Sequence, residues 1–490
     1  MRTSKSVSNP KVGPACRVVL VAVAGLLLAP AGCTVGPDFK PPATTMPTAW
    51  VPPTTAPSTQ QSVTVAQPPD IAQWWREFND PILDSLIQRA VDANLDLRLA
   101  ELRVRQARAA RRVTSSNWYP FFDTSGSYRR AGTGDVSSSL YQLGLDASWE
   151  IDVFGGTRRS VEAADAQIQI SLEDRRDVLV TLTSEVALAY IDLRGFQREI
   201  AIARENLDAQ RHSLEITRTR NVAGFVGPLD TANADASVAS TESAIPSLEQ
   251  SVRQSMYTLA VLLGEQPSAL IDELAPAHAI PAGPKQIPVG LPSDLLRRRP
   301  DIRRAEADLH SATAQVGVAV SDLYPRFSLI GSAGVRSSRF SQLMNWNNGF
   351  WSIGPSVSWP IWEGGRIQAN IEVQKLGADQ SLVNWQRTVL FALQDVENTL
   401  IAYEKEQQRR ELLTVAVAAN RRAFQIATNL YTNGETNFID VLNAQRSLLA
   451  TEDALVRSDT TIATNLIALY KALGGGWDES EATTQPAPKN

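Results

Sequence analysis

Two stretches of the chain alternate apolar and polar residues with a period of two. Over 143–152 the apolar side holds Leu143, Leu145, Ala147, Trp149 and Ile151, and the polar side holds Gly144, Asp146, Ser148, Glu150 and Asp152. Residues 352–361 repeat this pattern, and weaker alternation precedes each stretch over 122–128 and 327–335. A period of two predicts strands with one apolar and one polar face. We therefore expect two β-hairpins, at 121–153 and 326–362.

The expected strands have the length of membrane-spanning strands. Each is about 10 residues long, as a tilted strand needs to cross a bilayer. Aromatic residues gather near the strand ends, where membrane interfaces favour them; they include Trp118, Tyr119, Trp149, Tyr324, Trp359 and Trp362. The alternative interpretation is a hairpin of a soluble sandwich.

Long helices flank both hairpins. Residues 157–221 and 366–433 contain no proline and one glycine each, and apolar residues recur at steps of three and four, as at Val178, Leu182 and Val186. A helix of this length spans about 100 Å, so we expect extended helices packed on one another. Shorter helices are expected at 82–117, 229–264, 293–323 and 437–473, with a kink at Pro246.

The chain contains an internal duplication. Tyr119-Pro120 returns as Tyr324-Pro325, Gly155-Gly156 as Gly364-Gly365, and Gly224 with Asp230 as Gly434 with Asp440. These landmarks keep their order. We infer a first repeat at 81–264, a linker at 265–292 and a second repeat at 293–476.

The N-terminus has the layout of a secretory signal. Basic residues precede the apolar run 18–29, which is too short to span a bilayer, and Ala31-Gly32-Cys33 follows. This resembles a bacterial lipoprotein cleavage site. It predicts a signal peptide at 1–32, lipidation of Cys33, a proline-rich tether at 33–80 and a disordered tail at 477–490.

Composition excludes several classes of function. The net charge is −5, which disfavours a nucleic-acid binder. Two cysteines and three dispersed histidines offer no metal site, and no catalytic motif is visible, so we expect neither an enzyme nor a cofactor. The glycine pairs at 155 and 364 lack the lysine of a phosphate-binding loop and are interpreted as strand-to-helix corners.

The topology predicts an oligomer. Between one helical stretch and the next the chain forms two strands, so it returns to the side of the membrane that it left. All helices therefore lie in one compartment, and 129–141 and 336–350 are expected as outer loops. Four strands cannot close a barrel, and open sheet edges in lipid leave unpaired amides. The chain must therefore oligomerise, and these arguments permit two, three or four copies.

Several motifs resemble the outer-membrane efflux lipoproteins of the NodT type, relatives of TolC and OprM. They are 33–39 (CTVGPDF), Trp75 with Asp80-Pro81, Arg299-Pro300-Asp301-Ile302, the segment 434–448 and the terminal 469–477. The resemblance implies an α+β membrane protein: a trimer with a twelve-stranded β-barrel continued by a periplasmic barrel of helices, in the outer membrane of a Gram-negative bacterium. It also implies a periplasmic adaptor protein and an inner-membrane pump of the resistance-nodulation-division class as partners.

Functional residues follow from this interpretation. Asp146, Glu150 and Asp152 are expected on the lumenal face of the barrel. The helix hairpins should turn at Gly224 with Asp230 and at Gly434 with Asp440, which the resemblance assigns to adaptor contact. Candidates for the pore constriction are Arg421, Gln425 and Thr428, where many relatives carry acids.

Three functions compete. An efflux channel requires both the strands and the long helices. A structural, periplasm-spanning lipoprotein without conductance requires only the helices. A lipid-anchored enzyme requires a catalytic motif that the sequence does not display.

Overall fold

The computed structural model describes residues 34–43, 46–47, 50, 71–284 and 292–478. Cys33, the signal peptide and most of the expected tail lie outside these residues. The chain divides into two compact units, whose described parts are 34–41, 107–168 and 308–381 in unit 1 and the remaining residues in unit 2. Four helices belong partly to each unit: α3 (Leu95–Ser115), α4 (Gly156–Val222), α8 (Pro300–Ser321) and α9 (Arg366–Asn433).

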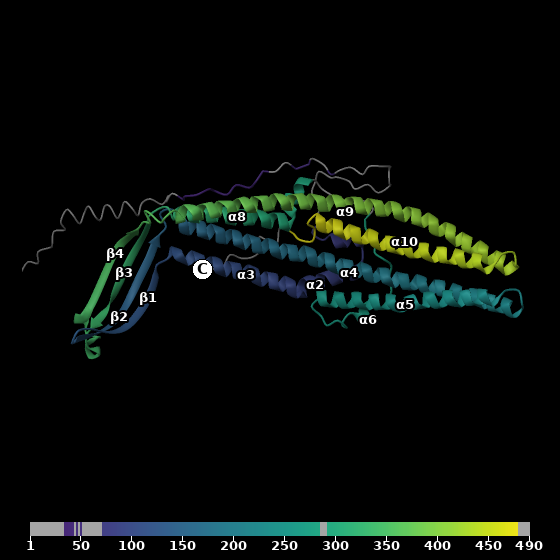
Figure 1. Cartoon of the computed structure of the whole chain (residues 1–490), viewed down its shortest axis with the longest axis horizontal. Coiled ribbons are helices and arrows are strands. Elements are labelled where there is room, and N and C mark those ends of the chain that lie inside the picture. The colour runs from purple at the N-terminus through teal and green to yellow at the C-terminus, as the bar shows by residue number, and fades with distance from the viewer. Residues whose placement is uncertain (1–33, 44–45, 48–49, 51–70, 285–291, 479–490) are drawn as a thin grey trace, which may run out of the picture. The chain divides into compact units, whose positions relative to one another are not determined.

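Unit 1 contains one antiparallel sheet in the order β1-β2-β3-β4 (Figure 1). Its strands are β1 (Phe121–Thr133), β2 (Val136–Ile151), β3 (Arg326–Ser337) and β4 (Gly349–Ser358). Both expected hairpins are therefore present. The central pairing of β2 with β3 joins strands from the two repeats, with Leu143 opposite Val335.

The first outer loop is much shorter than expected. β1 and β2 remain paired through 129–141 up to Thr133 opposite Val136, so only Gly134 and Asp135 form the turn. Gly134 has φ +63°, a conformation that glycine adopts without strain. The polar composition of 129–141 therefore reflects strand ends rather than a loop. The second loop, 338–348, falls within the expected range and carries the 3-10 turns η4 (Phe340–Gln342) and η5 (Trp346–Asn348).

Unit 2 contains the remaining helices and the main apolar core. They are α2 (Pro81–Ala93), α5 (Pro228–Leu262), α6 (Ile271–Leu274), α7 (Leu295–Arg298) and α10 (Phe438–Ala472), with 3-10 turns η1 (Trp74–Phe78) and η3 (Pro292–Asp294). α5 continues through Pro246. In unit 1 the turn η2 (Ser116–Trp118) precedes β1.

Two expected helices are divided by identifiable residues. The helix expected over 82–117 breaks at Asn94, whose side-chain oxygen accepts from the backbone N–H groups of Asp96 and Leu97 at 2.9 and 3.0 Å. Asn94 thus caps α3. The helix expected over 293–323 breaks before Pro300, because a residue preceding proline disfavours helical conformation.

Residues of the expected tether and of the expected tail both contribute to the core of unit 2. Trp74, from the expected tether, stacks on Tyr470 of α10 at 5.3 Å between ring centroids. Trp477, from the expected tail, donates its indole N–H to the carbonyl of Arg298 at 3.1 Å, and its ring centroid lies 4.3 Å from the guanidinium of Arg176. The folded body thus extends beyond both boundaries expected from the sequence.

Candidate functional site

The two faces of the sheet differ in chemistry. Asp123 of β1 lies directly opposite Asp146 of β2, so both carboxylates are on one face. The same row continues through Ser332 to Ser352, whose hydroxyl oxygens lie 2.7 Å apart. Glu150 lies on this face too, four residues after Asp146. The polar face therefore carries a row of hydrogen-bonding groups across all four strands.

The opposite face is apolar and exposed. The register places residues from all four strands there, among them Phe122, Leu145, Trp149, Leu329, Trp351 and Ile353. Trp351 is 79% exposed. A sheet with one polar and one exposed apolar face suits a wall between water and lipid.

Both edges of the sheet lack a neighbouring strand within the described part of the chain. β1 pairs only with β2, and β4 pairs only with β3. Each edge therefore leaves backbone N–H and C=O groups without a strand partner, which a hydrocarbon environment does not tolerate.

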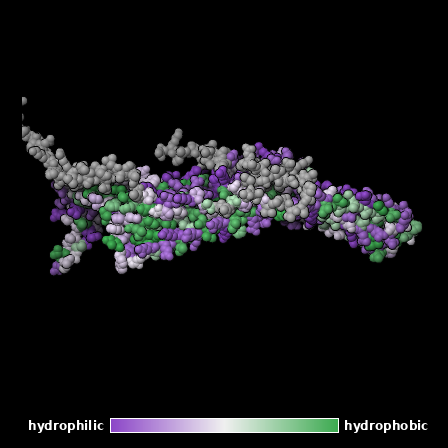
Figure 2. All heavy atoms as spheres, turned by 90° about the horizontal axis from the view of Figure 1, so that it is seen from above, coloured by the Kyte–Doolittle hydropathy of each residue, from purple (hydrophilic) through white to green (hydrophobic). Residues whose placement is uncertain are grey.

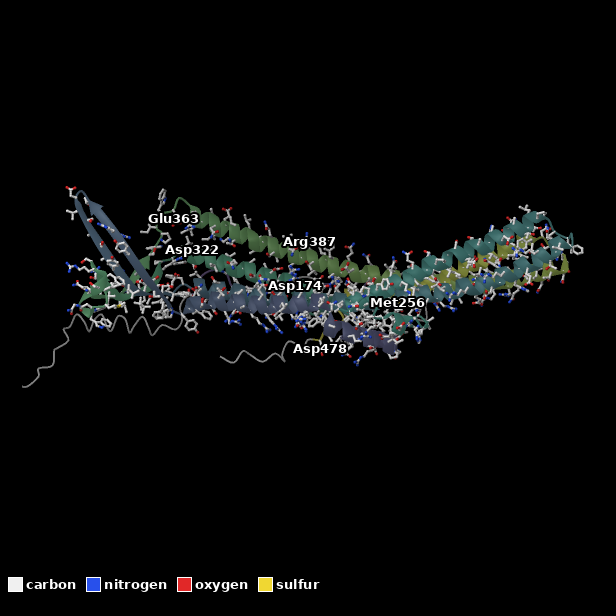
Figure 3. The ribbon with its side chains drawn as sticks, turned by 90° about the horizontal axis from the view of Figure 1, so that it is seen from below. Asp174, Met256, Asp322, Glu363, Arg387 and Asp478 are labelled. Atoms are coloured by element: carbon white, nitrogen blue, oxygen red, sulfur yellow. The ribbon has the colours of Figure 1, made fainter. Side chains whose placement is uncertain are left out.

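Acidic residues form helix caps and ion pairs at the turns between strands and helices. β2 ends at Ile151, so Asp152 lies beyond the strand on whose lumenal face we expected it. Its carboxylate accepts from the backbone N–H groups of Thr157 and Arg158 at 3.2 and 2.9 Å and caps α4. Two other corners hold Asp322 and Glu363, which are labelled in Figure 3. Asp322 pairs with Arg326 at 2.6 Å, and Glu363 pairs with Arg366.

The helix hairpins turn at the expected glycines. Gly224 and Gly434 have φ +80° and +81°. After each, the next residue donates its backbone N–H to the carbonyl five residues earlier, from Phe225 to Arg220 at 2.9 Å and from Glu435 to Leu430 at 2.8 Å. This is the Schellman ending of a helix, which needs a left-handed residue. Asp230 and Asp440 stand in the first turns of α5 and α10, where a carboxylate suits the helix dipole.

The two hairpins pack on each other. Their shared cluster contains Leu214, Ala234, Tyr431, Phe438, Val441 and Leu442. Arg220 of α4 joins them, because its guanidinium donates to the carbonyls of Tyr431 and Thr432 at the end of α9 and lies 4.7 Å from the Tyr431 ring centroid.

The hairpin ends also present a groove and apolar side chains. The groove has a volume of 790 Å³ and is lined by residues of both hairpins, including His212, Glu215, Phe225 and Asn433. Val222, Phe225 and Leu229, all at the α4–α5 turn, are 89%, 75% and 72% exposed. On the face seen in Figure 2, hydrophobic residues reach the surface among hydrophilic ones.

The constriction candidates lie on α9 before its end. Arg421 forms an ion pair with Glu452 of α10 at 2.5 Å, and Gln425 is exposed. The hydroxyl of Thr428 donates to the carbonyl of Phe424 at 2.8 Å. The structure therefore places the three on one helix within two turns.

Sequence reasoning missed two residues of this arrangement. Asp123 lies in a strand whose alternation is weak, although counting in twos from Phe122 along the apolar face would have left Asp123 on the opposite, polar face. Arg220 gives no sequence signal beyond its position in the last turn of a helix, where cations are favourable.

The described residues show no group of three or more His, Cys, Asp or Glu side chains that could hold a metal ion. Among the helices described, none is at once long and apolar enough to cross a membrane.

Comparisons with known proteins agree with this geometry. A family model described as "Outer membrane efflux protein" matches residues 86–265 and 291–475. Nodulation protein T of Rhizobium leguminosarum bv. trifolii is 32% identical over 453 residues, covering 91% of this chain and 95% of the relative. The pyoverdine export outer membrane protein OpmQ of Pseudomonas aeruginosa is 33% identical over 421 residues, covering 83% and 88%.

A solved structure of the outer-membrane channel OprN is 36% identical, with a TM-score of 0.83, covering 91% of this chain and 100% of that one. The resemblance inferred from the sequence is therefore confirmed, and so is the expected fold class of four strands per chain with long helices.

Proposed function

The chain belongs to the outer membrane efflux protein family, and we propose that it works as a passive trimeric conduit without catalytic activity. It is an outer-membrane channel component of an efflux system and extends into the periplasm. What carries the proposal is the sheet of four strands with one polar face, one exposed apolar face and two unpaired edges.

Three copies would pair these edges. β1 of one copy joined to β4 of the next satisfies the backbone of both edges by one repeated contact. Three copies give twelve strands, as the family resemblance implies. The row of Asp123, Asp146, Ser332 and Ser352 then faces water inside, and the Trp149 face meets lipid.

We assign the attachment to the membrane to the N-terminus and the attachment to the adaptor protein to the hairpin ends. We assign a lipid to Cys33 from the sequence of its cleavage site. We assign the adaptor contact to the hairpin ends, because an exposed apolar group beside a groove is typical of a docking surface. An inner-membrane pump supplies the energy.

The partner proteins, rather than this chain, determine which substrate is exported. One relative is named for nodulation and another for pyoverdine export, and the chain resembles both almost equally, at 32% and 33% identity. A wide polar lumen conducts what the pump delivers.

Planar-bilayer recording tests the proposal. We expect discrete conductance steps from the purified oligomer, and larger steps from Arg220→Ala, which loses the contact between hairpins. Heat-unfolded protein at the same concentration is the control. If folded oligomers of the wild type and of Arg220→Ala both gave no conductance, the structural lipoprotein would be favoured instead.

A further inference from the structure

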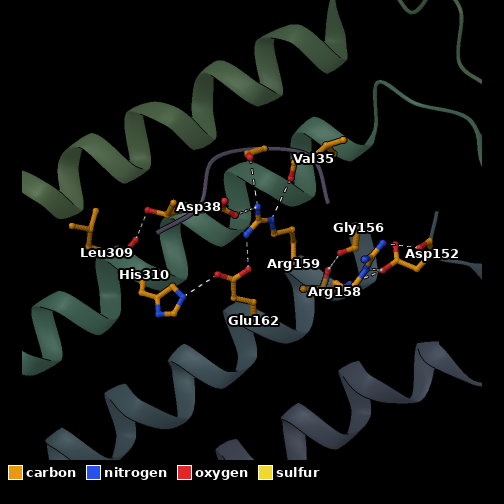
Figure 4. Close-up of polar contacts among 12 residues, drawn as sticks. Val35, Asp38, Asp152, Gly156, Arg158, Arg159, Glu162, Leu309 and His310 are labelled. Atoms are coloured by element: carbon orange, nitrogen blue, oxygen red, sulfur yellow. Dashed lines mark hydrogen bonds and ion pairs between the residues drawn. The ribbon is translucent and has the colours of Figure 1, made fainter. Parts of the chain in front are cut away.

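The N-terminal segment, residues 34–39, satisfies a buried cation. The Arg159 side chain of α4 is 5% exposed. Its Nε donates to the carbonyl of Val35 at 3.2 Å, and its Nη2 donates to the carbonyl of Gly36 at 3.5 Å and to Oδ1 of Asp38 at 2.6 Å (Figure 4). Its fourth acceptor, Glu162 at 2.8 Å, belongs to α4 itself. Without the segment a buried guanidinium would lose three of its four acceptors, which is costly.

Glycines create the space that the segment occupies. Gly36 has φ +88°, and a Cβ there would lie 2.5 Å from Cα of Gly317 in α8. A Cβ on Gly317 would lie 2.8 Å from Cδ of Arg159. A Cβ on Gly155 would lie 2.8 Å from the methyl group of Thr34. Three glycines, distant in sequence, thus permit one close backbone contact.

The segment also contacts the corner where β2 becomes α4. The N–H of Val35 donates to the carbonyl of Phe154 at 3.2 Å. At its other end the ring of Phe39 stacks on His310 of α8 at 4.4 Å, and Nε2 of His310 lies 3.0 Å from Oε1 of Glu162. Val35, Gly36, Asp38 and Phe39 therefore contact α4, α8 and the β2–α4 corner through main-chain, charge and ring interactions.

We propose that Gly155, Arg159, His310 and Gly317 form a peptide-binding seat for the chain's own N-terminal segment, and that occupation of this seat orders the β2–α4 corner so that the sheet can assemble. The seat prefers a peptide that bends at a glycine in the Gly36 position, with an acid two residues later and an aromatic residue after it. One peptide bond joins Thr34 to Cys33, so a docked segment also fixes where a lipid on Cys33 is attached; this last point and the assembly readout rest on the proposed function.

The test compares two helical glycines of unit 1. Gly317→Ala places a methyl group against Arg159, whereas Gly377→Ala, in α9, meets no atom within 4 Å. Full-length protein of each kind is purified from membranes. Three measurements follow: hydrogen exchange of peptides 34–40 and 150–156, the amount of heat-resistant oligomer, and the mass of the N-terminal peptide.

For Gly317→Ala we expect at least tenfold faster exchange in both peptides and a severalfold loss of oligomer, with an unchanged N-terminal mass. Gly377→Ala should match the wild type. If Gly317→Ala does not fold, Val35→Pro removes the N–H that contacts Phe154 without touching a helix and should give the same pattern.

Two results overturn the seat: unchanged exchange of peptide 34–40, or faster exchange of that peptide alone with normal oligomer. An unacylated N-terminus in wild-type protein, together with the expected exchange pattern, would retain the seat and refute the lipid assigned to Cys33.

Discussion

Arg220 and Tyr431 connect the two repeats at the hairpin ends. The guanidinium of Arg220 donates to the carbonyl of Tyr431 and lies over its ring, while the Tyr431 hydroxyl donates to Thr217 at 3.3 Å. Gly224 and Gly434 are equivalent in the duplication, so Arg220 corresponds to Leu430 rather than to another arginine. The repeats therefore share a fold but differ in this contact, which exists once per chain.

Replacing Arg220 should loosen the hairpin ends. Arg220→Ala removes a cation from the C-terminal carbonyls of α9, and we expect a local loss of about 1–3 kcal/mol. Hydrogen exchange of peptide 429–436 should accelerate accordingly. The control is Arg218→Ala, which breaks only an exposed pair with Asp235 and should cost at most about 1 kcal/mol. Equal exchange in the two variants would mean that the Arg220 contact does not hold α9.

Gly434→Pro should abolish export while the sheet still assembles. Gly434 needs φ +81°, and proline fixes φ near −65°, so the α9–α10 turn cannot form. The sheet belongs to the other unit and contains none of these residues. The measurements are export in intact cells and the amount of assembled oligomer. Glu435→Ala is the control. Loss of oligomer equal to the loss of export would refute this division of roles.

Trp149 and Trp359 should contribute equally to the stability of the sheet. Each donates its indole N–H to a carbonyl at a helix-to-strand junction, Trp149 to Trp118 at 2.9 Å and Trp359 to Leu323 at 3.0 Å. We expect phenylalanine at either position to cost about 0.5–1.5 kcal/mol, because the ring remains while the hydrogen bond is lost. The temperature at which the oligomer dissociates measures this. Trp351→Phe, at an exposed position of β4, should change that temperature less.

Opposed carboxylates should give the sheet face a preference for cations. Asp123 and Asp146 lie opposite each other, and three chains would supply six such groups. In the double variant Asp123→Asn with Asp146→Asn, we expect the reversal potential in a salt gradient to move toward zero. The shift should shrink at high salt, because screening shortens the reach of the charges. The matched control is Asp135→Asn in the β1–β2 turn; an equal shift there would assign the preference to the outer end.

The sequence predicted which helices and strands form better than it predicted the residues at which they begin and end. The period of two predicted both hairpins, and the absence of proline predicted the long helices. α9 begins and ends at the expected residues, Arg366 and Asn433. The break at Asn94 was not predicted, because asparagine occurs inside helices as well as at their N-terminal caps. Its amide also donates to the carbonyl of Leu262 at 2.8 Å, a partner that is distant in sequence. The same holds for Trp477, whose arginine neighbours are distant in sequence.

The candidate site was predictable where local conformation determines it. Gly224 and Gly434 follow from the need for a left-handed residue at a helix end. Asp152 was misplaced, because alternation alone does not tell the last strand residue from the first cap of a helix. Arg159 was missed, because its partners come from residues 34–38 and no local pattern relates it to them.

A change of one half-buried carboxylate should alter the pH dependence of stability. Burial raises the pKa of Asp192, in α4, from its ordinary value of 3.8. An acid whose pKa is raised on folding stabilises the fold fully below its ordinary pKa, and this contribution is lost as pH rises through the folded pKa. Asp192→Asn should therefore raise the thermal midpoint at pH 7, and the difference from wild type should vanish as pH falls toward 3. Asp208→Asn, exposed on the same helix, should change the midpoint little at either pH. A lower midpoint for Asp192→Asn than for wild type at pH 7 would contradict this prediction.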